Sequence, residues 1–161
     1  MYNLKENNYL QILFILSILT LGSALIIEYI FGYQPCSLCK IERIPYLFSI
    51  IILITNYFFR GNQNFYGVLL ILIFSFSIII SVYHLSIEQG FISESTVCET
   101  KGLNLLTKED ILNSLQELNI SCKNVAFKIF GLSLTSYNIL VSILMLLLSI
   151  KIYTFGNGIK K

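Results

Sequence analysis

The chain has 161 residues, enough for one domain, and carries a net charge of only +2. Its residues are 55% hydrophobic and 12% charged, whereas soluble globular domains carry about 25% charged residues. This composition excludes an ordinary soluble protein, and the absence of a basic stripe argues against nucleic acid as a partner. We therefore expect a membrane protein surrounded by membrane lipid.

Four long apolar runs organise the sequence, at about residues 9–29, 44–59, 65–85 and 133–153. Each is near the ~20 residues that a helix needs to cross a hydrocarbon core of ~30 Å. Because a backbone inside a bilayer must satisfy its own hydrogen bonds, each run is predicted to be an α-helix. We expect residues 1–161 to form a single all-α domain, a bundle of four transmembrane helices. The second run is the shortest and needs the polar turn before it to reach the interface.

The first run is predicted to be a retained span rather than a cleaved signal peptide. Its positive flank is weak, since Lys5 is followed by Glu6, and its apolar stretch is longer than a signal peptide needs. Gly22, Ser23 and Ala24 within it are interpreted as a small-residue packing patch.

The short segments predict the orientation of the bundle. Both termini and the turn at about 60–64 must share one side, which holds five basic residues and one acid, Glu6. The other side holds six basic residues diluted by eight acids, mostly in a long loop at about 86–132. The positive-inside rule therefore favours cytoplasmic termini. The short first loop, at about 30–43, and the long second loop then lie outside.

All four cysteines fall in these two outer loops. Cys36 and Cys39 lie in the first, and Cys98 and Cys122 lie in the second. An even number of cysteines is compatible with two disulfides, with one four-thiolate metal site or with four free thiols. Outside the cytoplasm disulfides persist, which favours the first of these.

The first pair has a CxxC spacing, which lets the sulfurs close a small, reducible ring. A following helix would place its positive N-terminus at the pair and favour a thiolate. Arg43 lies four residues after Cys39, so a continuous helix would stack it one turn away on the same face. There its positive charge could stabilise a Cys39 thiolate. It could also donate hydrogen bonds to a carbonyl oxygen of a ring compound bound against that sulfur.

A CxxC pair alone also fits a structural bridge or half of a zinc site. Zinc would need a second pair at similar spacing, and Cys98 and Cys122 are 24 residues apart. We therefore expect no metal and favour redox chemistry.

Polar residues cluster at the outer ends of the second, third and fourth runs. The chain's only histidine, His84, ends the third run, and Glu88 follows it by four residues. The simplest interpretation is an interfacial histidine paired with an acid. Tyr46, Tyr137 and Asn138 are interpreted mainly as interfacial belt residues, with a contact to a bound ring as the lesser alternative.

The second cysteine pair flanks a segment at residues 108–119, KEDILNSLQELN, whose apolar residues recur at helical spacing. It predicts a short amphipathic helix, lying either on the membrane surface or on protein. Cys98 and Cys122 can bridge only if the loop folds back on itself. The bridge would either tether the loop or, if exposed, exchange with a partner's thiolate.

Three segments together resemble the disulfide bond formation protein B family of quinone-dependent membrane thiol oxidases. They are PCSLCKIER at 35–43 followed by Pro45 and Tyr46, VYHLSIEQG at 82–90, and Cys122 followed by FGLSLTSYN at 130–138. The resemblance covers nearly the whole chain. It implies a multi-pass protein of the bacterial inner membrane whose cysteine loops face the periplasm.

The resemblance also implies a sequence of exchanges. A reduced periplasmic thioredoxin-fold disulfide oxidase of the DsbA type would attack Cys98 and form a mixed disulfide. The freed Cys122 would attack Cys36 and release Cys39 as a thiolate facing ubiquinone or menaquinone.

By the same resemblance, two further residues would serve the quinone. Arg43 matches the arginine that holds and polarises it, and His84 would line its pocket or assist proton movement.

Two other classes of protein fit the sequence less well. A structural four-span membrane protein with loop-bracing disulfides would not need Arg43 beside the CxxC pair. A transporter or channel would place charged residues within its spans, and positions in the middle of these spans are nearly all apolar.

Overall fold

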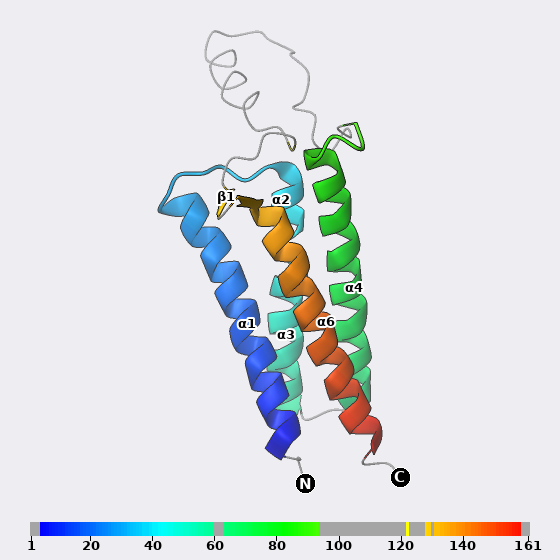
Figure 1. Ribbon diagram of the computed structural model, residues 1–161. Helices are drawn as coiled ribbons and strands as arrows, with labels where there is room; N and C mark the ends of the chain where they lie inside the picture. Colours follow the sequence, from blue (N-terminus) through cyan, green and yellow to red (C-terminus); the bar gives the residue numbers. More distant parts are fainter. Residues whose placement is uncertain (1–3, 60–62, 94–121, 123–127, 130, 159–161) are drawn as a thin grey trace, which may run out of the picture.

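The computed structural model describes residues 4–59, 63–93, 122, 128–129 and 131–158. Four long helices run side by side as a bundle (Figure 1). They are α1 Leu4–Tyr29, α3 Ile44–Phe59, α4 Gln63–Glu88 and α6 Leu134–Gly158. Each contains one of the apolar runs, and their ends lie within a few residues of the predicted ones. Apart from one small hairpin, the regular structure of the described residues is helical.

Three of these helices are long and apolar enough to cross a membrane. The qualifying segments are Asn8–Tyr29, Asn64–Glu88 and Leu134–Phe155. The second predicted span corresponds to α3, which has only 16 residues. At 1.5 Å per residue it is about 24 Å long, short of a ~30 Å hydrocarbon core.

A short helix, α2 Ser37–Ile41, precedes α3 and is separate from it. The prediction of a continuous helix from the cysteine pair into the second span is therefore wrong. Glu42 and Arg43 form a turn between the two helices. The cause is Pro45, which has no N–H to donate to the carbonyl of Ile41 and whose ring would clash with that carbonyl. Within the first turn of α3 the same proline is tolerated.

The interior of the bundle is apolar and is crossed by buried hydroxyl groups. The buried core cluster consists of Leu13, Tyr46, Ile52, Leu53, Leu70, Phe74, Met145 and Ile152. Ser17 of α1 and Ser49 of α3 approach to 2.9 Å between their Oγ atoms, and both are fully buried. Small and hydroxylated residues of this kind allow close contact between membrane helices.

Close packing occurs at Gly67 rather than at the patch predicted in the first span. A Cβ at Gly67 would lie 3.2 Å from the Cα of Tyr153, so α4 and α6 approach closely there. A Cβ at Gly22 would meet nothing within 4 Å. The interpretation of Gly22 as part of a packing patch is wrong.

A two-stranded antiparallel hairpin, β1 Lys128–Ile129 and β2 Leu132–Ser133, leads into α6. It was not predicted. Gly131 has a φ of +83°, a conformation that the tight turn requires and that glycine adopts without strain. Ser133 then caps α6, since its Oγ accepts the N–H of Ser136 at 3.3 Å.

The cysteine pair lies at the end of the bundle opposite the start of α1 and the end of α6. In Figure 1 the start of α1 and the end of α6 lie together at one end, and α2 lies at the other. The predicted amphipathic helix at 108–119 and Cys98 lie outside the described residues.

Candidate functional site

Cys36 and Cys39 form a disulfide at the start of α2. Cys36 is the N-cap of this helix, and its Sγ accepts the backbone N–H of Cys39 at 3.2 Å. The two sulfurs differ in exposure, because Cys36 is buried and Cys39 is half-buried. The pair is therefore asymmetric, with one sulfur facing the protein interior and the other nearer its edge.

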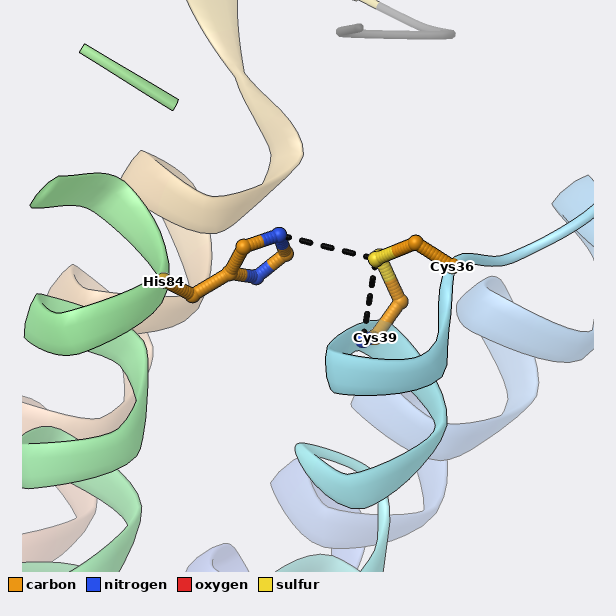
Figure 2. Close-up of side chains that lie close together, drawn as sticks. All are labelled: Cys36, Cys39 and His84. Atoms are coloured by element: carbon orange, nitrogen blue, oxygen red, sulfur yellow. Dashed lines mark hydrogen bonds between the residues drawn. A yellow bond between two sulfur atoms is a disulfide. The ribbon is translucent and has the colours of Figure 1, made fainter. Parts of the chain in front are cut away.

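His84, near the end of α4, points its ring at this pair (Figure 2). Its Nε2 lies 3.5 Å from the Sγ of Cys36. Its Nδ1 lies 3.0 Å from Oε1 of Glu42 and 3.3 Å from Oγ1 of Thr135. An ionised carboxylate can only accept a hydrogen bond, so Nδ1 donates to Glu42. The neutral ring then presents the lone pair of Nε2 to the sulfur.

The residues around His84 are buried. His84 is 3% exposed, Glu42 8% and Thr135 6%. A buried carboxylate needs hydrogen-bond donors. The contact of His84 Nδ1 with Glu42 supplies one, and it fixes the direction of the imidazole ring.

The acid beside His84 is thus Glu42, not the Glu88 to which helical spacing pointed. Sequence reasoning assigned no role to Glu42 or Thr135. Both lie in segments that resemble the family, at 35–43 and 130–138, and Glu42 is also an acid three residues after the CxxC pair. Their meeting with His84 depends on how α2, α4 and α6 pack together.

Cys122 lies in the same buried cluster as the first cysteine pair. Cys36, Leu38, Ile87 and Cys122 form this cluster, and Cys39 packs at its edge. Cys122 is 4% exposed and is itself disulfide-bonded. Its predicted partner, Cys98, lies outside the described residues. The structure thus places one cysteine of the second loop in the same buried cluster as Cys36.

Arg43 makes an ion pair with Glu28 near the end of α1. Both side chains are about one fifth exposed. Arg43 follows the end of α2, and its backbone N–H donates to the carbonyl of Lys40 at 3.3 Å. The guanidinium links the start of α3 to the end of α1, with Glu28 as its acidic neighbour.

Tyr46 belongs to a hydrogen-bonded network inside the bundle. Its hydroxyl donates to Oδ1 of Asn138 at 2.6 Å and lies 3.0 Å from Oγ of Ser142. Asn138 in turn donates to Oγ of Ser81 at 2.7 Å. Tyr46 is 2% exposed, so its interpretation as a belt residue is wrong. Tyr137, the next residue of that group, is half-buried.

Comparison with known proteins identifies the family. The family model described as "Disulfide bond formation protein DsbB" matches residues 6–152. A protein of Rickettsia prowazekii (strain Madrid E), named "Uncharacterized protein RP370", is 36% identical over 141 residues, which make up 84% of this chain and 81% of the relative. No solved structure gives a significant match.

The chain therefore belongs to the DsbB family of disulfide bond formation proteins. Membership identifies it as a membrane thiol:disulfide oxidoreductase. The three long apolar helices agree with a membrane location.

Proposed function

We propose that the chain passes electrons from the thiols of a periplasmic thioredoxin-fold disulfide oxidase, through its two cysteine pairs, to a membrane quinone. The observation that carries this proposal is the packing of Cys122 in one buried cluster with Cys36. Thiol–disulfide exchange requires the attacking sulfur to reach the sulfur it attacks. A second-loop cysteine in the same buried cluster as Cys36 supports such an approach.

Electrons enter at the second pair. A thiolate of the reduced partner attacks Cys98 of a Cys98–Cys122 disulfide, forms a mixed disulfide and releases Cys122 as a thiolate. Cys122 then attacks Cys36, breaks the Cys36–Cys39 bond and releases Cys39. The burial of Cys36 in the shared cluster favours attack at this sulfur over Cys39.

The exchange closes when the partner's second thiolate displaces Cys98 and leaves the partner oxidised. Cys98 then attacks Cys122 and releases Cys36, which restores the second disulfide. Two electrons and two protons have moved from the partner to Cys36 and Cys39. Oxidation of this dithiol re-forms the first disulfide.

His84 serves the sulfur of Cys36 in this cycle. Its Nε2, 3.5 Å away, takes a proton from the thiol and gives it back to the thiolate. Glu42 keeps the ring turned toward the sulfur and stabilises the imidazolium that forms. A disulfide that only braced a loop would need neither residue, which disfavours a purely structural protein.

The quinone, ubiquinone or menaquinone, supplies a lipid-soluble acceptor of two electrons and two protons. The residues near the pair fit such a group. Arg43 has five N–H donors, and its ion pair with Glu28 leaves others to meet a carbonyl oxygen. The exposed side chains of Ile44, Leu47 and Phe48 follow it on α3 and offer an apolar face to a ring or its tail.

We further propose that α3 is a fourth span, completed at its outer end by α2. The chain then crosses the bacterial inner membrane four times, as one domain. Cytoplasmic termini and periplasmic cysteine loops follow from the basic residues of the short segments. The arrangement in Figure 1, with α2 opposite the chain ends, supports this topology.

A turnover assay tests the proposal. The full-length protein, purified in detergent, is mixed with a reduced thioredoxin-fold oxidase and a soluble quinone analogue, and quinone absorbance is followed. We expect many turnovers per chain, and none for Cys39→Ser. Quinone consumption at the uncatalysed rate would refute the proposal. It would favour the alternative, a structural membrane protein whose disulfides only brace its loops.

A further inference from the structure

Three atoms that bind soft metal ions meet at the first cysteine pair. The Sγ atoms of Cys36 and Cys39 and a ring nitrogen of His84 lie within 4.8 Å of one another. Figure 2 shows the imidazole aimed at the pair. We propose that the reduced form of this site, with both thiolates and His84 as ligands, binds one zinc ion and is thereby held out of the redox cycle.

The distances suit zinc. Zinc lies about 2.3 Å from a thiolate sulfur and about 2.0 Å from an imidazole nitrogen. At tetrahedral angles, a sulfur and a nitrogen on one zinc are then about 3.5 Å apart, and two sulfurs about 3.8 Å. The Nε2 of His84 already lies 3.5 Å from the Sγ of Cys36. Only the separation of the two sulfurs must increase, and reduction of their bond permits that.

The surroundings of His84 also match a zinc ligand. Histidines that bind zinc usually donate their other ring N–H to a carboxylate or carbonyl, which fixes the tautomer and orients the ring. Here Glu42 accepts from Nδ1 at 3.0 Å. Nε2 therefore presents its lone pair to the sulfurs before any metal arrives.

Charge and access are compatible with a bound ion. Two thiolates and one zinc ion sum to zero, which suits a site where Cys36 and His84 are 6% and 3% exposed. Cys39 is half-buried, which leaves room on its side for water as a fourth ligand. Binding releases two protons from the two thiols, and no electrons are transferred.

The sequence argued against a metal because the second cysteine pair has the wrong spacing. The third ligand comes instead from α4, 48 residues after Cys36. In the oxidised protein both sulfurs are held in the disulfide. Zinc is therefore expected to bind only the reduced state and to block its reoxidation.

The test uses the full-length protein with Cys98→Ser and Cys122→Ser, so that the first pair is the only source of thiolates. Zinc is titrated into the reduced and the oxidised forms against a chromophoric chelator, and cobalt(II) is used in parallel as a spectroscopic probe. We expect one zinc per reduced chain, none per oxidised chain, and the visible bands of tetrahedral cobalt with thiolate ligands. A reduced protein that takes up no zinc overturns the proposal.

Variants separate this site from adventitious thiol binding. Glu42→Gln should weaken zinc binding about 10–100-fold, and His84→Ala at least as much. Glu88→Gln, on the same helix as His84, is the matched control and should bind like the parent. Equal affinities in all four proteins would also overturn the proposal. Because the titration involves neither quinone nor partner, its outcome is independent of the turnover assay.

Discussion

The Nε2 of His84 lies 3.5 Å from the Sγ of Cys36, although 48 residues separate them in the chain. The contact joins the end of α4 to the start of α2, and Glu42 holds the ring in place from its other side. It gives the buried sulfur of the pair a neighbour that can exchange a proton.

The first prediction concerns this contact. His84→Gln should slow the oxidation and reduction of the Cys36–Cys39 pair by about 100-fold, in the range typical of a lost acid–base group. Glu42→Gln should have a smaller effect in the same direction, because the ring remains but loses its charged partner. Stopped-flow kinetics with thiol quenching measures both rates. Ser86→Ala is the control, since its Oγ donates to the carbonyl of Val82 on its own helix. A parental rate in His84→Gln would remove the proposed role.

A second prediction concerns Arg43. Arg43→Lys keeps the positive charge but loses the planar guanidinium with its paired N–H donors. The apparent KM for quinone should rise about tenfold, because about one charge-assisted hydrogen bond is lost. Glu28→Gln removes the ion-pair partner and keeps the guanidinium. If Arg43 contacts quinone, only its own substitution raises KM. A similar rise in both variants would indicate that Arg43 acts through the α1–α3 junction.

A third prediction concerns the order of exchange. Cys122→Ser cannot release the partner from Cys98, so a covalent complex should accumulate and be visible on a non-reducing gel. Cys98→Ser should form no such complex. A complex in Cys98→Ser but not in Cys122→Ser would reverse the assigned roles of the two cysteines.

The polar network inside the bundle gives a fourth prediction. Tyr46→Phe removes a hydroxyl that contacts both Asn138 and Ser142 and leaves their buried polar groups short of a partner. The cost should be about 1 kcal/mol, measured as a lower Tm in detergent. Tyr57→Phe is the matched control, because Tyr57 is 79% exposed. Equal Tm values for the two variants would show that the network adds no stability.

Local patterns predicted the helices well. A long apolar segment in a membrane forms a helix regardless of which other helices it packs against. The bounds of α1, α3, α4 and α6 therefore lie within a few residues of the predicted ones. The break after Ile41 was missed because the helix at the cysteine pair was expected to run on into the second span. Pro45 has no N–H to bond to the carbonyl of Ile41, and this ends the first helix.

The site was predicted only in part. The CxxC pair and the histidine were identified by residue type, but their contact was not. Spacing along one helix suggested Glu88 for His84, whereas packing between helices provides Glu42. Likewise, no local signal separates a buried Tyr46 from a tyrosine of the interfacial belt. Contacts between helices depend on how the helices pack, and periodicity carries no such information.

The most direct test of the account is a time-resolved trapping of thiols during one turnover. Reduced partner is mixed with the oxidised chain, the reaction is quenched with an alkylating reagent, and mass spectrometry reads each cysteine. We predict that Cys98 is the first to be found with the partner, that a Cys36–Cys122 disulfide then appears with Cys39 alkylated, and that added quinone restores both original disulfides. A Cys36–Cys39 disulfide that stays intact while the partner is oxidised would contradict the passage of electrons between the two pairs.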